Sequence, residues 1–327
     1  MAHAATFSEA GIPGRARHSF LGRLRDGDEI AHLATLLFAC AILLIAGLLV
    51  LELFRNSGEA RHKFGWAFFL TRTWDPVAGQ FGALPFIYGT LVTSAVALVL
   101  SVPLGLGAAI FLSELAPPRV SDALTFIIEL LAAVPSVIYG LLAVFALVPL
   151  LRDPIQPFLG RAFGFVPFFQ GPSYGVGFLA AGIILAIMVV PFIISISRES
   201  LLAVPTDQRE AALALGATRW ESTWHVVVPH ARLGITGSIF LALARALGET
   251  MAVTMVIGNT PQIAASLFAP GYTIPAVIAN EFTEATSDIH LSALIELGLV
   301  LFLLTIVINA FARLMVLATT RRGTTHP

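Results

Sequence analysis

The sequence predicts an all-α, polytopic membrane protein with about six membrane-spanning helices. Of its 327 residues, 57% are hydrophobic and only 12% are charged, a balance that a soluble domain with a water-facing surface does not sustain. Crossing a hydrocarbon core of about 30 Å takes about 20 apolar residues at about 1.5 Å each, and runs of that length recur along the chain. The six runs are residues 30–54, 86–112, 123–151, 176–196, 235–257 and 292–317.

The first apolar run, residues 30–54, is expected to stay in the mature protein. It is too long and begins too far into the chain for a secretory signal, and no clear small-residue cleavage site follows it. Residues 1–29 are polar and lack apolar periodicity, which predicts a cytoplasmic tail. Residues 30–327 are therefore expected to form one transmembrane domain.

Basic residues set the expected orientation of the spans. If the N-terminus is cytoplasmic, twelve of the 19 Lys and Arg residues fall in inward-facing segments and six in outward-facing ones. Positive side chains concentrate on the cytoplasmic side of membrane proteins, so both termini are expected in the cytoplasm. The expected outer loops carry a charge near zero and form no basic funnel, so if the chain imports an anion, delivery by a soluble binding protein is favoured.

Composition also excludes several kinds of activity. A net charge of −1 predicts no nucleic-acid partner, and the single cysteine, Cys40, permits neither a disulfide nor a cysteine metal site. No spaced set of metal ligands or catalytic triad appears, so we expect no metal site and no enzyme. A nucleotide-binding P-loop needs Lys followed by Ser or Thr, but the one lysine, Lys63, precedes Phe64. This chain is therefore expected to bind no cofactor, and any ATP and Mg²⁺ would be used by a separate ATPase.

The longest inward-facing connection, about residues 200–234, begins with a predicted helix. Thr206 and Asp207 are typical of a helix start, and residues 211–215 are strong helix formers. Gly216 stands just past the expected helix end, where a positive φ favours glycine. A second helix is expected after this turn.

That second helix has a recognisable start and an expected end. Thr218 and Glu221 are spaced as a capping box, and Trp220 and Trp224 stand one turn apart on a single face. Pro229 is expected to close the segment. The whole connection is therefore predicted to be helix, glycine turn, helix.

The same connection carries a spaced motif that resembles the EAA loop of ABC importer permeases. The matching residues are Glu210, Ala211, Ala212, Gly216, Val226, Val228 and Pro229. The family pattern is Glu-Ala-Ala, three residues, Gly, nine residues and Ile-x-Leu-Pro; the spacing fits, with Val replacing Ile and Leu. The resemblance implies that the loop sits in a groove of a cytoplasmic ATPase, with Glu210, Ala211, Ala212 and Gly216 as the ATPase-coupling positions.

Two other interpretations would also account for a polar helical connection of this length. A solvent-exposed hairpin that merely joins two spans stays open. A DNA-binding helix-turn-helix is excluded, because the four arginines and four acidic residues between positions 198 and 234 cancel and leave nothing to neutralise phosphates.

Arg245 lies near the middle of the fifth apolar run. Placing an arginine at the centre of a membrane helix raises the free energy of insertion by roughly 2.5 to 3.5 kcal/mol. Arg245 must therefore face a partner or a water-filled path. Glu249 follows one turn later, so the two side chains can neutralise each other, while the guanidinium also matches a tetrahedral oxyanion. Two roles stay open for Arg245 and Glu249: they line the substrate path, or they form a structural ion pair.

The other charges and prolines within the apolar runs are assigned structural roles. Glu129 and Glu296 lie nearer the ends of the third and sixth runs, where such side chains can reach toward the interface. Pro103, Pro135 and Pro191 are expected within helices, where they would produce kinks.

Three further stretches extend the resemblance from the EAA loop to the C-type permeases of phosphate-specific ABC importers (PstC type). They are residues 81–90 (FGALPFIYGT), 134–140 (VPSVIYG) and 245–250 (RALGET). The resemblance covers about residue 30 to the end and implies the type I permease (MetI-like) fold in a bacterial inner membrane. It also implies a second, PstA-like permease, two copies of a PstB-like ATPase and a periplasmic, PstS-like phosphate-binding protein. Arg245 and Glu249 would match charged transport residues of the family.

The leading hypothesis is therefore a permease subunit that imports phosphate while ATP is hydrolysed on another chain. The EAA loop does not separate phosphate from molybdate or sulfate, because it contacts the ATPase rather than the substrate. A non-conducting scaffold or signalling subunit is the alternative from another class. A secondary transporter is a further alternative, which uptake under ATP depletion would distinguish.

Overall fold

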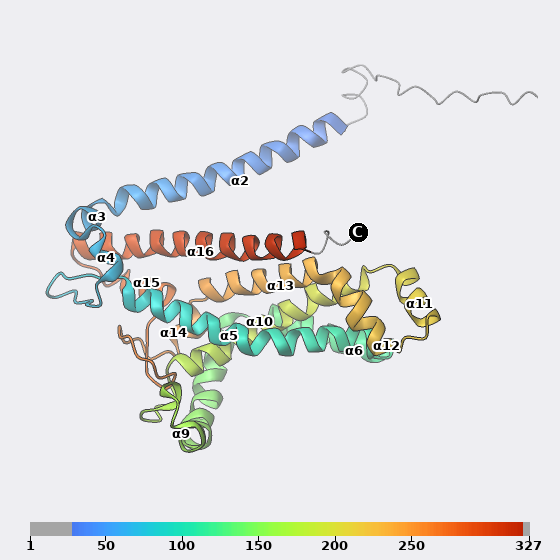
Figure 1. Cartoon of the computed structure of the whole chain (residues 1–327). Coiled ribbons are helices and arrows are strands. Elements are labelled where there is room, and N and C mark those ends of the chain that lie inside the picture. The colour runs from blue at the N-terminus through green and yellow to red at the C-terminus, as the bar shows by residue number, and fades with distance from the viewer. Residues whose placement is uncertain (1–27, 323–327) are drawn as a thin grey trace, which may run out of the picture. The chain divides into compact units, whose positions relative to one another are not determined.

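The computed structural model describes the backbone of residues 28–322 and the side chains of residues 31–314. The described chain is helical, and its one extended pairing is an isolated bridge between Asp75 and Gln80, which confirms the expected all-α class (Figure 1). The chain divides into two compact units, Met1–Glu52 and Leu53–Pro327. The first unit contributes most of α2 (Asp28–Asn56), and the expected tail lies outside the described residues except for its last two positions.

Six helices in the described part of the chain are long and apolar enough to cross a membrane, as expected. They are Ala31–Asn56, Leu84–Leu115, Ser136–Phe163, Phe178–Leu202, Arg219–Gly248 and Asp288–Leu314. The first, second, fourth and sixth overlap the predicted runs closely. The third and fifth differ from prediction for identifiable reasons.

The predicted third span is broken at Pro135. One helix, α6 (Pro118–Ala133), ends before it, and another, α7 (Ser136–Leu142), begins after it, while Val134 and Pro135 are extended. A proline ring disfavours helical geometry in the residue before it, so Pro135 separates two helices where a kink in one had been expected. The apolar helix of membrane length is therefore Ser136–Phe163, which continues through α8 (Val148–Leu150) and α9 (Gln156–Phe163).

The fifth span begins and ends earlier than predicted. It starts at Arg219, within the connection that was expected to stay outside the membrane run, and is continuous to Gly248. At Glu249 the backbone is extended, with φ −69° and ψ 130°, and only a short helix, α14 (Met251–Thr254), follows. The predicted fifth run extends to residue 257, nine residues beyond the end of α13 at Gly248.

At the centre of the second unit, α10 (Phe178–Leu202) packs against α5 (Leu84–Ile110) and α13 (Val228–Gly248). In the most apolar 18-residue stretch of α10, 67% of the residues are buried, a larger share than in any other candidate span of the described chain. Gly182 permits the close contact with α5, because a Cβ on it would lie 2.3 Å from a methyl of Val96. This packing makes α10 the core helix.

Polar and proline residues also shape the central helices. The hydroxyl groups of Ser197 on α10 and Ser238 on α13 are hydrogen-bonded at 2.8 Å inside the core. Pro103 lies within α5 and Pro191 within α10, as the sequence predicts. The two helices therefore carry the expected prolines without ending at them.

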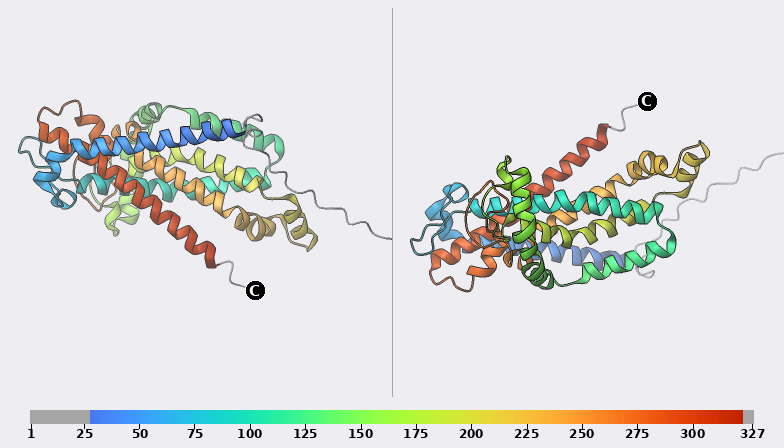
Figure 2. Two further views of the ribbon diagram at one scale, coloured as in Figure 1. Left: turned by 90° about the horizontal axis from the view of Figure 1, so that it is seen from above. Right: turned by 90° about the horizontal axis from the view of Figure 1, so that it is seen from below.

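The two ends of the second unit differ in construction (Figure 2). One end holds a hairpin of two short helices, α11 (Thr206–Ala214) and α12 (Arg219–Ser222). The opposite end holds α3 (Gly58–Phe64) and α4 (Ala67–Leu70) together with loops between the spans. Among these loops lies α15 (Ile274–Glu281), just before α16 (Asp288–Arg322) begins.

Aromatic and polar contacts tie the loops of this end to α16. The indole N–H of Trp74 donates to Glu281 Oε2 at 2.9 Å, and His290 Nε2 lies 3.1 Å from the same oxygen. The ring of Phe81 stacks on His290 with centroids 5.1 Å apart. Loop residues far apart in sequence are thereby joined at the first turn of α16.

Candidate functional site: the α11–α12 hairpin and the end of α13

The predicted helix, glycine turn and helix are all present. Between α11 and α12, Gly216 has φ +89°, the left-handed conformation that the position was expected to need. The hydroxyl of Thr218 accepts the Glu221 backbone N–H at 3.2 Å, and Glu221 Oε2 accepts the Thr218 backbone N–H at 2.8 Å. This reciprocal pair is the predicted capping box.

The sequence-predicted coupling residues lie on the accessible side of the hairpin. Glu210, Ala211 and Gly216 are exposed and Ala212 is half-buried. Small side chains at 211 and 212 leave the backbone of α11 open to close approach. These four positions are therefore brought together on one short helix and its turn.

Exposed apolar side chains surround those positions. Leu215, at the turn, is 90% exposed, and Trp220 and Trp224 pack edge to face with ring centroids 5.6 Å apart while staying accessible. Apolar groups gathered at the tip of a connection indicate a surface that another protein covers.

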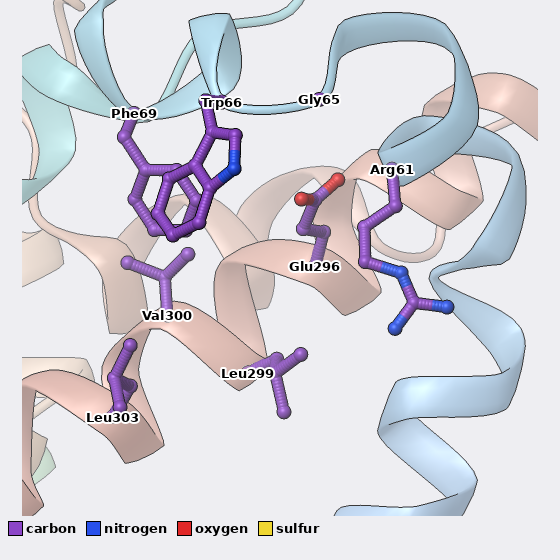
Figure 3. A pocket seen from close by; sticks show the side chains of 8 residues that line it. All are labelled: Arg61, Gly65, Trp66, Phe69, Glu296, Leu299, Val300 and Leu303. Carbon is purple, nitrogen blue, oxygen red and sulfur yellow. The ribbon is translucent and has the colours of Figure 1, made fainter.

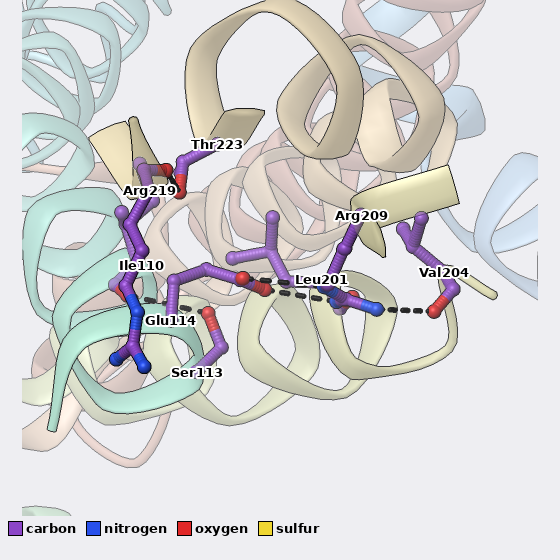
Figure 4. Close-up of polar contacts among 8 residues, drawn as sticks. All are labelled: Ile110, Ser113, Glu114, Leu201, Val204, Arg209, Arg219 and Thr223. Atoms are coloured by element: carbon purple, nitrogen blue, oxygen red, sulfur yellow. Dashed lines mark hydrogen bonds and ion pairs between the residues drawn. The ribbon is translucent and has the colours of Figure 1, made fainter. Parts of the chain in front are cut away.

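An ion pair that the sequence did not reveal anchors α11 to the end of the second span (Figure 4). Arg209 Nη2 lies 2.9 Å from Glu114 Oε1, and Arg209 Nε lies 3.2 Å from Glu114 Oε2. The same guanidinium donates to the carbonyls of Leu201 and Val204 at the end of α10. Arg209 therefore joins the hairpin to two membrane helices at once.

The pair is largely protected from water, since the side chains of Arg209 and Glu114 are 19% and 11% exposed. A two-point guanidinium-carboxylate contact fixes orientation as well as distance. Glu114 lies 95 positions from Arg209 in the chain. No local spacing rule reaches that far, and the only clue was that Arg209 directly precedes the Glu-Ala-Ala motif.

Pro229 does not close the second helix, contrary to prediction. Residues Thr223–Val227 form a π-helical turn, in which the Val228 N–H donates to the Thr223 carbonyl. Proline has no N–H, and its ring collides with the carbonyl four residues earlier in a regular helix; the wider turn before it removes that conflict. The hairpin therefore continues into α13 as one helix.

Arg245 projects from α13 near its far end. The side chain is exposed on the surface of this chain, and its guanidinium carbon lies 4.4 Å from the centroid of the Phe192 ring. Stacking on an aromatic face stabilises a cation while leaving its N–H groups free to bind an anion. No carboxylate of the described chain forms an ion pair with it.

Arg245 and Glu249 are not paired, contrary to the neutralising contact that a continuous helix would allow. Because α13 ends at Gly248, Glu249 no longer lies one helical turn beyond Arg245. Its Oε1 instead accepts the Ala252 backbone N–H at 3.3 Å, at the start of α14. Glu249 thus stabilises the break in the helix beside Arg245.

The two other intramembrane acids lie in contrasting surroundings. Glu129 is exposed on α6, where many neighbouring side chains are apolar. The side chain of Glu296 is buried, and only 2% of the residue is exposed. Within residues 28–322 no group of three or more potential metal ligands lies together.

A family model described as "Binding-protein-dependent transport system inner membrane component" matches residues 101–321, more than half of the chain. The chain belongs to this family. It is a transport permease component and not an enzyme, and the matched region includes the α11–α12 hairpin and Arg245.

Curated relatives are similar to this permease over most of its length. A phosphate transport system permease protein PstC of Mesorhizobium japonicum is 46% identical over 306 residues, covering 92% of this chain and 94% of the relative. The PstC of Haemophilus influenzae is 46% identical, covering 86% and 90% respectively. A probable PstC of Methanocaldococcus jannaschii is 41% identical, covering 78% and 83%.

Solved structures show that this permease shares its fold with ABC importers. A bacterial importer of the acidic polysaccharide alginate matches with TM-score 0.58 at 18% identity, covering 89% of this chain and 98% of the other. The MetNI methionine ABC transporter, in an inward-facing conformation, matches with TM-score 0.52 at 18% identity, covering 71% and 94%. The predicted type I, MetI-like permease fold is therefore confirmed.

Proposed function

We propose that this chain is the permease subunit of an ATP-driven phosphate importer. The observation that carries the proposal is its identity of 40–46% with proteins named as phosphate transport permeases, over most of their length and its own. None of these relatives is named for molybdate, sulfate or a signalling role, so the comparisons do not favour those alternatives.

The proposed complex contains three other components. A second, PstA-like permease would complete the path, two copies of a PstB-like ATPase would use ATP and Mg²⁺, and a PstS-like protein would deliver phosphate from the periplasm. The exposed apolar hairpin supports the ATPase contact, and the charge distribution supports an inner-membrane protein with both termini cytoplasmic.

The coupling step follows from how the hairpin is held. An ATPase that grips Glu210, Ala211, Ala212 and Gly216 would also pull on Arg209, one residue before them. Because Arg209 is bonded to Glu114 and to the end of α10, movement of α11 would be passed to two spans. Movement of α12 would be passed to α13 directly, since the helix is unbroken from Arg219 to Gly248.

In the proposed path, Arg245 provides the charge that attracts the anion. Its planar N–H groups can donate two parallel hydrogen bonds to phosphate oxygens. Its exposure on the isolated chain is what a residue facing a path between two permeases would show. Glu249 is proposed to line the same path and to hold the helix break that turns the backbone there.

The test is uptake of labelled phosphate in cells that express this chain with its three partners. We expect uptake to require the chain, to need ATP, and to be inhibited by excess arsenate but not by sulfate or molybdate. Inhibition by sulfate or molybdate would overturn the substrate while keeping the permease. Uptake that survives ATP depletion while a proton gradient remains would overturn the ATP-driven mechanism.

A further inference from the structure

A pocket of about 370 Å³ lies where α3 and the start of α4 face α16, at the end opposite the hairpin (Figure 3). Its wall is mainly apolar, formed by Trp66, Phe69, Leu299 and Leu303 among others. Two charged side chains of opposite sign, Arg61 and Glu296, line the same pocket. Neither residue takes part in the coupling or transport roles assigned above.

Glu296 presents an unsatisfied carboxylate oxygen to this pocket. Only 2% of the residue is exposed, and its Oε2 is buried without a hydrogen-bond partner in the described chain. Leaving a buried polar group unpaired is unfavourable, and more so when the group is charged. A carboxylate placed this way is suited to receive a hydrogen-bond donor from outside the chain.

Arg61 has an unsatisfied hydrogen-bond donor, just as Glu296 has an unsatisfied acceptor. Its guanidinium carbon lies 3.5 Å from the centroid of the Phe54 ring, so one face is covered, yet Nη1 is buried without an acceptor. Arg61 and Glu296 form no ion pair with each other, although they share the pocket. Two opposite charges that share a pocket without forming an ion pair, each with one buried polar atom left unsatisfied, match a ligand that carries both charges itself.

We propose that this pocket binds the head group of a zwitterionic phospholipid whose cation is a primary ammonium. The ammonium donates to Glu296 Oε2 and the phosphate accepts from Arg61. A simple cation would leave Arg61 unpaired and an anion would leave Glu296 unpaired. A quaternary ammonium has no N–H to donate, so it satisfies the carboxylate less well.

The surroundings favour a lipid over a small soluble zwitterion. Glu296 is eight residues, about 12 Å, from the first residue of α16, so the pocket lies along the first part of a helix that is apolar enough to span a membrane. From Leu303 the exposed apolar surface of α16 continues through Ile306 and Val307. Acyl chains can follow that surface while the head group occupies the pocket.

Native mass spectrometry of the purified full chain provides the test. The delipidated protein is titrated with phosphatidylethanolamine, phosphatidylcholine and phosphatidylglycerol that carry identical acyl chains. We expect one saturable phosphatidylethanolamine adduct, bound about tenfold more tightly than either other lipid. Glu296→Gln and Arg61→Gln should each remove that preference, whereas the exposed controls Glu284→Gln and Arg72→Gln should keep it.

A second variant separates binding from folding. Leu299→Trp fills the pocket but leaves both charges in place, so it should abolish the adduct while the helical circular dichroism stays unchanged. Equal affinity for the three lipids in the wild-type chain would overturn the proposal. So would an adduct that survives both Glu296→Gln and Leu299→Trp.

Discussion

Two arginines of this chain, Arg209 and Arg245, occupy opposite kinds of surroundings. Arg209 is bonded to a carboxylate and two backbone carbonyls, and little of it meets solvent. Arg245 has one aromatic ring beneath it, no carboxylate, and an open face. The difference shows that a charge whose hydrogen bonds are satisfied within its own chain holds structure together, whereas one left open is available to a substrate or partner.

The largest expected effect is at the open arginine. Arg245→Gln removes the charge and the paired donors, so phosphate uptake should fall on the order of 100-fold. Co-purification of the second permease should be unchanged, because Arg245 forms no ion pair within the described chain and its ring contact, with Phe192, is local. Arg232→Gln, at an exposed arginine on the same helix, is the matched control and should retain uptake. Loss of assembly in Arg245→Gln would instead assign it to a structural pair.

A smaller loss of uptake is expected when the ion pair between Arg209 and Glu114 is removed. Glu114→Gln removes the charge that receives Arg209 and should cost about 1–3 kcal/mol at that contact. Uptake should fall about tenfold, and phosphate-stimulated ATP hydrolysis should approach the basal rate because movement of α11 no longer reaches the second span.

The exchanged pair, Glu114→Arg with Arg209→Glu, should recover part of the coupling lost in either single variant. Glu199→Gln, at an exposed acid near the end of α10, is the control and should behave as wild type. A double variant no better than the singles would show that the ion pair is not the coupling contact.

Substitution of Gly216, at the turn between α11 and α12, should reduce uptake moderately. Gly216→Ala forces a side chain into a φ of +89° and should cost about 1–2 kcal/mol, although no atom lies within 4 Å of the new Cβ. Uptake should fall two- to fivefold, and the affinity for the ATPase in a pull-down titration should fall with it.

Gly237→Ala is the control for that substitution, because Gly237 also has open space around it but is helical. It should be neutral or slightly stabilising. Asn tolerates the left-handed conformation better than Ala, so Gly216→Asn should lie between Ala and wild type. Equal loss in the Ala and Asn variants would argue against backbone strain as the cause.

The smallest effect is expected at Glu249. A carboxamide oxygen can still accept the Ala252 N–H, so Glu249→Gln should change uptake less than twofold. Glu249→Ala removes that bond, weakens the helix break and should have the larger effect. If Glu249→Gln matched the loss in Arg245→Gln, the two side chains would have to interact during transport even though they are apart here.

Sequence patterns predicted local features of this protein well. The capping box at Thr218 and the left-handed Gly216 depend on neighbours within four residues, and both are present as expected. Apolar runs likewise located most spans, because crossing a bilayer imposes a minimum length. The end of α13 was missed since apolar residues continue past Gly248, and hydrophobicity does not report where backbone hydrogen bonding stops.

Features that depend on distant residues were not predictable in the same way. The partner of Arg209 is 95 positions away, and nothing in a single sequence marks two such positions as neighbours. The continuity of the helix through Pro229 was also missed, because the standard expectation for proline does not anticipate a π-helical turn placed just before it. The first depends on a long-range ion pair and the second on a π-helical turn, and neither is contained in local residue preferences.

The unbroken helix from Arg219 to Gly248 makes the fifth span a lever. Its 30 residues extend about 45 Å, with no loop along the way to absorb motion. A tilt of about 5° applied at the hairpin would displace the other tip by about 4 Å over that length. The tip is where the helix ends beside Arg245, so if the hairpin is the ATPase contact proposed above, a small tilt there would produce a larger displacement beside Arg245.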